Sequence, residues 1–308
     1  MPAELIQRYD TIGHQVLDLE AELGVSTEPH KETLDSLIEG ARGKIQVKDM
    51  YTREDALGIL TTIEGILRNN RFKQGGNAAD LFHEGLGSKK IDCDDTSFIY
   101  LSIADALGLP LVAVSAPGHL FVRFILNDGS YINWETTSTT ERGNDYYISW
   151  RNISPVAIDN GVYLRNLSRH EIIALAYNNR GSAWAGKGNL DEAIKDYNKA
   201  IRLNPNHAAA YNNRGFAWFN KGNLDEAIKD YNEAIRLDPN FARAYTNRGS
   251  AWSKKGNLDK AIEDYNEAIR LDPNYAAAYY NRGFAWFNKG NPAKAASDFR
   301  KYESLMRR

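Results

Sequence analysis

Apolar residues near the start of the chain recur with the spacing of amphipathic helices. Over residues 4–23 they return every three or four positions, which predicts one helix, and a looser series predicts a second over residues 33–41. Thr52 begins a third series, and Asp55 three residues later forms an acidic version of a capping box. We therefore expect a helical lead-in over residues 1–70.

The next segment contains one strongly apolar helix. Residues 72–76 are rich in glycine and predict a loop, and residues 78–86 predict a short helix. A longer helix begins with Asp92 or Cys93 at its cap, and it is apolar enough to lie at the centre of a core. Gly108 ends this helix.

Three apolar runs after this helix predict strands. They cover residues 111–115, 119–126 and 131–136. The Asn-Asp-Gly sequence at 127–129 predicts a hairpin between the last two.

The length of the hairpin loop decides which side chains share a face of the sheet. With three loop residues and Gly129 in the left-handed conformation, Phe121 lies opposite Glu135. Glu135 is then a diagonal neighbour of His119, at roughly 7 to 8 Å between Cα atoms. A two-residue loop would present Trp134 instead, so the sequence leaves two registers open.

The chain changes character twice after the hairpin. Residues 138–152 are polar and predict a loop over the strands, and residues 153–167 offer short strand material. Ser168 and Glu171 then form a capping box that opens a helix. We place a domain boundary here.

From this boundary the sequence repeats with a period of 34 residues. Ala-Tyr-X-Asn-Arg-Gly occurs at Ala176, Ala210, Ala244 and Ala278, and each copy is followed by a tryptophan and by Lys-Gly-Asn. This pattern resembles the tetratricopeptide repeat (TPR) and implies an all-α solenoid of helix pairs. The expected repeats cover residues 174–207, 208–241, 242–275 and 276–308.

The resemblance also implies a concave groove that holds peptides. Its positions correspond to Asn178, Asn212, Thr246 and Tyr280 in one row, and to Ser182, Phe216, Ser250 and Phe284 in the next. Two aromatic stations, Phe216 with Phe219 and Phe284 with Phe287, should be separated by a polar one. The alternative is that these phenylalanines pack on an adjacent repeat or on the first domain.

Composition fits two ordinary globular domains. The chain has 308 residues, 43% hydrophobic and 25% charged, with a net charge of −2. The first 170 residues carry 24 acidic and 16 basic side chains, and the remainder carry 16 and 22. The halves could therefore dock, or the second could favour acidic partners. Because basic and acidic residues alternate, we expect no nucleic acid partner.

Cysteine content and hydropathy indicate a compartment. A single cysteine excludes an internal disulfide and favours a reducing environment. The start lacks a signal-peptide pattern, and no run approaches the ~18 apolar residues of a membrane span. We expect a cytoplasmic protein with no membrane partner, and the sequence indicates no oligomeric state.

The one cysteine belongs to a candidate catalytic group. Cys93 at a helix N-terminus, His119 on a strand and Glu135 on the next strand are the parts of a Cys-His-acid nucleophile system. The helix dipole and an adjacent imidazole would lower the pKa of the thiol. The aspartates at 92, 94 and 95 oppose this, so His119 must supply most of the activation.

The same residues resemble a known core. The segments are 90–95, 107–110, 118–119 and 134–135. Together they resemble the transglutaminase-like core of the papain-like superfamily over about residues 78–137, which bacterial relatives join to TPR helices. The resemblance implies an α+β core with Cys93 as nucleophile, His119 as general base then acid, and Glu135 as the group that orients the imidazole. The family usually has Asp at that position, and Asn133 is the substitute.

Two functions follow. The first is a cysteine-dependent amide hydrolase, a protease or amidase and also a candidate acyl transferase, whose repeats (168–308) bind a protein or peptide partner for the core in residues 1–167. The alternative is a catalytically inactive interaction scaffold that uses the TPR groove, with Cys93 as a small buried hydrophobe. The aspartates beside Cys93 are expected to cap the helix, so we predict neither a metal nor a cofactor.

Overall fold

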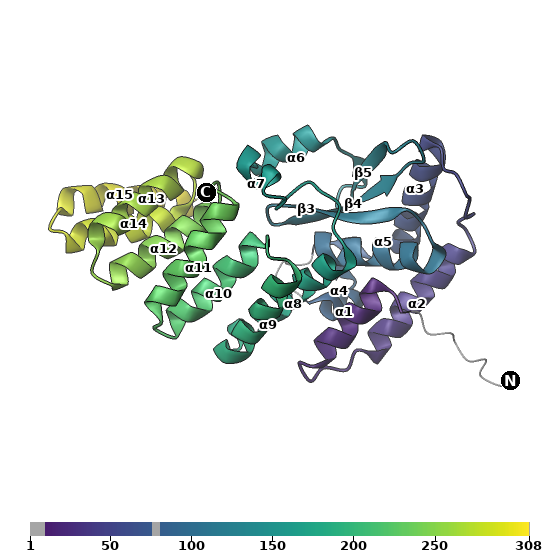
Figure 1. Cartoon of the computed structure of the whole chain (residues 1–308), viewed down its shortest axis with the longest axis horizontal. Helices are drawn as coiled ribbons and strands as arrows, with labels where there is room; N and C mark the ends of the chain where they lie inside the picture. Colours follow the sequence, from purple (N-terminus) through teal and green to yellow (C-terminus); the bar gives the residue numbers. More distant parts are fainter. Residues whose placement is uncertain (1–9, 76–80, 308) are drawn as a thin grey trace. The chain divides into compact units, whose positions relative to one another are not determined.

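The computed structural model describes residues 10–75 and 81–307, and the chain divides into two compact units (Figure 1). The first unit holds the described residues up to Ile153 and resumes over Tyr163–Ala183. The second holds Ser154–Val162 and the described residues from Trp184 onward. The division at Ala183 falls inside a helix, whereas the sequence analysis placed its boundary between residues 167 and 168.

The first unit contains a central helix covered by others. Its helices are α1 (Ile12–Ala21), α2 (Glu28–Arg42), α3 (Arg53–Asn69), α4 (Phe82–Ser88), α5 (Cys93–Leu107) and α6 (Asn144–Arg151). Helices α1 and α2 pack on α5, which packs with its other side on a sheet (Figure 1). This apolar helix is therefore central, as its composition predicted.

Two small sheets complete the first unit. Strands β1 (Lys73–Gln74) and β2 (Lys90–Ile91) form a parallel pair. The larger sheet is antiparallel in the order β3, β4, β5, β6, with bounds Leu111–Ala116, His119–Ile125, Tyr131–Glu135 and Thr140–Glu141.

The hairpin between β4 and β5 has the three-residue loop. Ile125 pairs with Tyr131, and the amide of Leu126 donates to the Ser130 carbonyl at 2.8 Å. Gly129 has a φ of 82°, in the left-handed region where glycine is favoured. The register that places His119 and Glu135 on one face is therefore confirmed.

The two faces of β4 have different neighbours. Leu120, Val122 and Phe124 belong to the apolar core that includes α5. Because side chains alternate along a strand, His119 and Phe121 point to the other face. There Phe121 stacks on Tyr147 of α6, with ring centroids 4.0 Å apart. One face thus anchors the sheet, and the other is left for polar side chains.

The second unit is built from paired helices. Its helices are α7 (Pro155–Asp159), α9 (Leu190–Leu203), α10 (Ala208–Asn220), α11 (Leu224–Leu237), α12 (Ala242–Lys254), α13 (Leu258–Leu271), α14 (Ala276–Asn288) and α15 (Pro292–Met306). Helix α8 (Arg169–Gly186) crosses from the first unit into the second. The pairs α8/α9, α10/α11, α12/α13 and α14/α15 follow the predicted repeats.

Close contact within each pair requires glycine. A Cβ added at Gly215 would lie 2.8 Å from the Tyr231 ring, and one at Gly249 would lie 2.8 Å from the Tyr265 ring. Such distances are shorter than real carbon contacts, so the Asn-Arg-Gly motif keeps glycine where an aromatic ring of the following helix crosses.

Several local predictions are confirmed. Thr52 and Asp55 form the capping box of α3, and Ser168 and Glu171 exchange the bonds of a second box at the start of α8. The predicted helix at 33–41 is real but longer, because α2 begins at Glu28. The parts of the predictions at residues 4–9 and 78–80 lie outside the described residues.

Three other segments were predicted wrongly. Residues 73–74 of the expected loop form β1. The expected loop at 138–152 contains β6 and α6, because Tyr147 gains a buried stack that local polarity does not reveal. Residues 155–159 form α7 rather than a strand, since Ser154 caps a turn that Pro155 begins.

Candidate functional site

Cys93 is the first residue of α5, held there by an aspartate cap. Asp92 is the N-cap, and its side chain accepts hydrogen bonds from the amides of Asp94 and Asp95 at 2.8 and 3.0 Å. The Asp95 side chain accepts from the Asp92 amide in return. The expected capping role is confirmed for Asp92. The cap fixes the backbone of the first turn of α5, and with it the position of Cys93.

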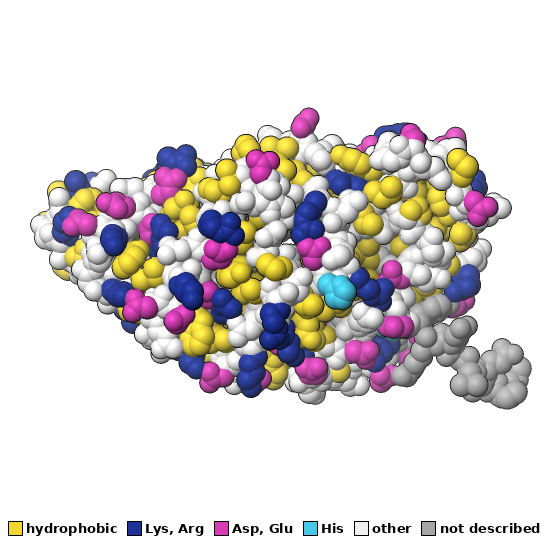
Figure 2. Space-filling model, in the orientation of Figure 1, with side chains coloured by type: hydrophobic (Ala, Val, Ile, Leu, Met, Phe, Trp, Pro, Cys, Tyr) yellow, Lys and Arg dark blue, Asp and Glu magenta, His cyan; other side chains and the backbone are white. Residues whose placement is uncertain are grey.

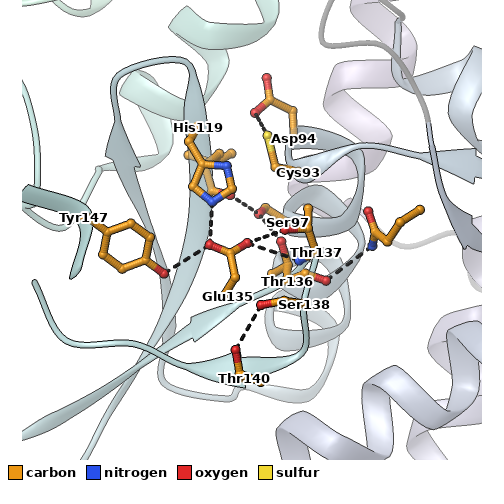
Figure 3. A network of polar contacts seen from close by, with 12 residues as sticks. Cys93, Asp94, Ser97, His119, Glu135, Thr136, Thr137, Ser138, Thr140 and Tyr147 are labelled. Carbon is orange, nitrogen blue, oxygen red and sulfur yellow. Dashed lines mark hydrogen bonds and ion pairs between the residues drawn. The ribbon is translucent and has the colours of Figure 1, made fainter. Parts of the chain in front are cut away.

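His119 and Glu135 are in direct contact. The Nε2 atom of His119 lies 2.6 Å from Oε2 of Glu135, and both side chains are buried (Figure 3). Thr137 donates its hydroxyl and amide to Oε1, and the Tyr147 hydroxyl donates to Oε2 at 3.3 Å. Glu135 is therefore satisfied on both oxygens and holds the imidazole in one orientation.

The environment fixes the charge on Glu135. Burial opposes ionisation, but the hydrogen bonds from His119 and Thr137 hold the pKa of Glu135 below its usual value. Because the carboxylate only accepts, Nε2 of His119 donates, which leaves Nδ1 as the acceptor of the neutral ring. Burial raises the pKa of Tyr147, so this phenol stays neutral and donates.

Asn133, the substitute acid, lies elsewhere. Its side chain accepts from Arg123 at 2.7 Å and donates to Asn144 at 2.9 Å. These contacts occupy Asn133 in an amide and guanidinium network. Of the two candidates, Glu135 is the residue that the structure brings to His119.

Cys93 lies near the other edge of the imidazole. Figure 3 shows Cys93 and Asp94 on the side of the His119 ring opposite Glu135. The thiol donates to Oδ1 of Asp94 at 3.6 Å. Cysteine, histidine and acid are thus contributed by α5, β4 and β5, and the catalytic role of the three stays a prediction.

The resting thiol is protonated. Burial raises the pKa of Cys93, the negative charge of Asp94 raises it further, and the Leu120 backbone amide only partly compensates. The sequence analysis expected the helix N-terminus and the histidine to dominate. Burial outweighs them in this structure, so any thiolate must form by proton transfer.

The acids around Cys93 carry less negative charge than the sequence suggests. Burial, followed by the charge of Asp92, raises the pKa of Asp95 to about 9, so Asp95 is neutral at pH 7. Burial also raises the pKa of Asp94, although hydrogen bonds oppose the shift. Asn179 of α8 donates one of these bonds, at 3.3 Å to Oδ2.

Helix α6 places aromatic side chains beside His119 that the sequence analysis did not predict. The Trp150 ring lies edge-on to His119 with centroids 5.3 Å apart, and Tyr146 lies 5.4 Å from Trp150. Both aromatic side chains are partly exposed, Tyr146 by 37% and Trp150 by 47%. The aromatic residues at 146 and 147, with a third one helical turn later at 150, were the available signal.

The second unit contains a separate pocket of about 460 Å³ on the repeat helices. Its lining residues are Phe216, Phe219, Tyr231, Asn247, Ser250, Ser253, Lys254, Tyr265, Asn281 and Phe284. Four of these were predicted groove positions. The two aromatic positions Phe216 and Phe284 are 46% and 45% exposed, so they are available to a ligand.

The other predicted groove positions are placed differently. Asn178, Asn212 and Thr246 are buried. Asn212 accepts from Asn247 of the next repeat at 2.9 Å, so its role in this structure is to join repeats. Tyr280 and Phe287 are exposed but do not line the pocket.

Charge on the repeats is paired. Lys221, Lys255 and Lys289 each bind an aspartate of the preceding repeat. On the face drawn in Figure 2, basic and acidic side chains of the repeat helices alternate. Within residues 10–75 and 81–307, no group of three or more His, Cys, Asp or Glu is arranged to hold a metal. No helix of that part is long and apolar enough to cross a bilayer.

Family models match the repeated part of the chain. One described as TPR repeat matches residues 181–222 and 253–290, and two described as Tetratricopeptide repeat match 208–241 and 230–263. Residues 181–290 are tetratricopeptide repeats. The predicted repeats are confirmed over these residues. None of these matches reaches residues 78–137, where the transglutaminase-like resemblance stays a prediction.

Several solved structures are similar to part of this chain. A crystal structure of MamA is 29% identical, covers 44% of this chain and 78% of its own, and has a TM-score of 0.41. The first TPR of Spaghetti (RPAP3) bound to an HSP90 peptide is 28% identical over 38% and 93% of the chains, with a TM-score of 0.37. The Arabidopsis OM64 TPR domain is 24% identical over 39% and 98%, with a TM-score of 0.38. No curated protein sequence matches the chain.

Proposed function

We propose that the chain binds a peptide segment of a partner protein in the pocket between Phe216 and Phe284. The observation that carries this proposal is the pocket itself, which joins residues of three consecutive repeats. Its exposed phenylalanines provide apolar surface at two ends of a polar strip. Such a surface suits an extended peptide whose side chains alternate between apolar and polar contacts.

The charge of the pocket indicates which chemical class of peptide it would bind. Lys254 is its one cationic lining residue, and none of the lining residues is acidic. The ammonium of Lys254 lies 4.8 Å from the centroid of the Phe219 ring. We therefore expect a segment with apolar side chains close to a carboxylate, since this charge complements lysine.

Binding can be tested with the full chain. Peptides enriched from a random display library are titrated against the parent, Phe216→Ala and Phe284→Ala by fluorescence anisotropy. Each substitution removes a ring from the pocket and should weaken binding about 10-fold or more. Met306→Ala, which removes an exposed apolar side chain outside the pocket, is the matched control. Equal affinities in all four proteins would exclude this pocket as the binding site.

We propose, as a second function, that Cys93 attacks an acyl carbon. The hydrogen bond of 2.6 Å between His119 and Glu135 supports this, because it orients Nδ1 as a base on the side of the thiol. Hydrolysis of an amide in a protein or peptide is the expected reaction. The pocket on the repeats would then recruit the substrate or its carrier.

The proposed reaction has the following steps. The Cys93 proton moves to Nδ1 of His119 as a carbon–sulfur bond forms at the acyl carbon. The carbon–nitrogen bond then breaks, and His119 gives its proton to the leaving amine. Water attacks the thioester while His119 takes a proton from it. The carbon–sulfur bond breaks, and that proton returns to the sulfur.

The single cysteine makes this function testable without a substrate. Rates of alkylation of Cys93 by iodoacetamide are measured from pH 4 to 10 in the parent, His119→Ala and the exposed control His170→Ala. With His119 as base, the parent and His170→Ala should react at least ~10-fold faster than His119→Ala at pH 7. Equal rates in the parent and His119→Ala would refute the dyad.

A further inference from the structure

Arg151, the last residue of α6, has a buried donor without a partner. Its Nε atom is buried, and no described residue accepts a hydrogen bond from it. Burying an unpaired donor is unfavourable, and more so when the group is charged. An arrangement of this kind is retained more readily where a ligand completes the bonding.

Several other half-buried or buried arginines among the described residues are satisfied, although the Nε of Arg142 is also buried without a partner. Arg123 donates to three asparagine side chains, and Arg214 forms a bidentate pair with Asp230. Arg180 binds Glu22 and the Leu19 carbonyl. Arg151 instead stacks its guanidinium 3.7 Å above the centroid of the Trp150 ring. A stacked guanidinium keeps its N–H donors in one plane.

The position of Arg151 links it to Cys93. Trp150, on which it stacks, is the ring that lies edge-on to His119. Arg151 also interacts electrostatically with Cys93 and with Glu135. A positive charge therefore lies within electrostatic range of the thiol, and it is stacked on the exposed Trp150 ring, which is 47% accessible.

We propose that Arg151 and Trp150 form a subsite for a carboxylate close to the bond that Cys93 attacks. This inference rests on the second proposed function, and it names the substrate class as an acyl compound or peptide with an acidic group next to the scissile carbonyl. The guanidinium pairs with the carboxylate through parallel N–H donors, and the Trp150 ring contacts the carbon skeleton beside it.

Two alkylating reagents that differ only in whether they carry a carboxylate or an amide test the subsite. Iodoacetate and iodoacetamide react alike: sulfur displaces iodide, a carbon–sulfur bond replaces the carbon–iodine bond, and the thiol proton goes to a base. Only iodoacetate carries a carboxylate on the reacting carbon. The ratio of the two rate constants therefore reports a cation beside the sulfur, independently of any catalytic turnover.

The expected result is specific to Arg151. The rate ratio of iodoacetate to iodoacetamide should be about 10-fold higher in the parent than in Arg151→Gln, the effect of one charge-assisted hydrogen bond. Arg151→Lys should keep part of the preference, because it keeps the charge. Arg142→Gln is the matched control, since Arg142 also stacks on an aromatic ring of α6, Tyr146, and should leave the ratio unchanged.

The outcomes separate this inference from the function on which it rests. An unchanged ratio in both Arg151→Gln and Arg151→Lys, with Cys93 still alkylated, overturns the subsite and leaves the thiol chemistry standing. If neither reagent reaches Cys93 in the folded parent up to pH 10, although both alkylate the unfolded chain, the thiol proposal fails and the subsite fails with it. Far-ultraviolet circular dichroism of each variant verifies that it is folded.

Discussion

At the scale of single residues, one repeat position alternates between phenylalanine and serine (Phe216, Ser250, Phe284), and the phenylalanine removes a hydrogen-bond partner. In the third repeat the Tyr265 hydroxyl lies 3.2 Å from the Ser250 hydroxyl. In the second repeat Phe216 occupies the place of Ser250, and the buried Tyr231 hydroxyl has no partner among the described residues. The aromatic station that makes the pocket therefore leaves a tyrosine unsatisfied.

This difference predicts opposite effects of the same substitution. Tyr231→Phe removes an unpaired buried hydroxyl, so we expect unchanged or increased stability. Tyr265→Phe removes a hydrogen-bonded hydroxyl and should cost about 1 kcal/mol. Urea unfolding of the two variants measures both values. A larger loss in Tyr231→Phe than in Tyr265→Phe would contradict this account.

A second residue-scale prediction concerns pH. His207 is 9% exposed, its Nε2 has no partner among the described residues, and burial lowers its pKa to about 4. An unfolded histidine titrates near 6.5, so the unfolded chain binds the extra proton first as pH falls. Stability should drop between pH 6.5 and 4, by about 3 kcal/mol in total.

His207→Phe provides the comparison, because Phe241 and Tyr275 hold the same position in the next two repeats. This variant should lose that part of the acid sensitivity, which urea unfolding at pH 7 and pH 4.5 would reveal. The same pH slope in the parent and the variant would mean that His207 does not titrate as proposed.

At the scale of elements, each of the last three repeats contains one largely buried arginine–aspartate pair, and its arginine also contacts the repeat before it. Arg248 of α12 binds both carboxylate oxygens of Asp264 on α13 and also reaches Asn232 on α11. Arg214 and Arg282 make the equivalent bonds in their repeats. Each arginine therefore fixes its own helix pair and the pair before it.

These hydrogen bonds predict a large loss of folding stability when the arginine side chain is removed. Arg248→Ala leaves the nearly buried carboxylate of Asp264 without its cation and should cost about 3–5 kcal/mol. Lys255→Ala breaks a pair whose aspartate is 85% exposed and should cost less than about 1 kcal/mol. Comparable urea midpoints for the two variants would show that the buried pair does not carry the coupling.

Sequence reasoning succeeded where a pattern is local or periodic. The 34-residue period specified the helix pairs, and Asn127-Asp128-Gly129 predicted the hairpin but left open the two registers between which the structure decides in favour of Glu135 beside His119. It failed at α6, whose one buried residue, Tyr147, packs on a strand remote in sequence. Arg151 was missed for the same reason, and the raised pKa of Cys93 depends on burial that no local motif encodes.

At the scale of the whole molecule, the first repeat is divided between the two units. Arg180 has the place that Arg214 has in the next repeat, yet it binds Glu22 and the Leu19 carbonyl in the first unit. Ile172 and Ala176 of the same helix belong to the core built around α5. The beginning of α8 is thus a structural part of the first unit.

This assignment predicts the behaviour of fragments. Residues 1–163 lack α8 and would expose the core side chains that Ile172 and Ala176 cover, whereas residues 1–186 retain them. We expect a lower urea midpoint for the shorter fragment, by the loss of two buried apolar contacts and of the Arg180 bonds. Identical midpoints would show that α8 is dispensable for the first unit.

The hydrogen bond from Asn179 to Asp94 has a consequence for recombination of domains. Asn179 belongs to a repeat motif, but it donates a hydrogen bond to the Asp94 carboxylate, which also accepts the hydrogen bond of the Cys93 thiol. A chimaera that exchanges the entire solenoid at its first repeat would therefore also replace one wall of the cysteine site. Exchange after Ala183 would replace the proposed peptide pocket and keep Asn179. The interior of α8 is therefore the suitable point at which to join a different solenoid.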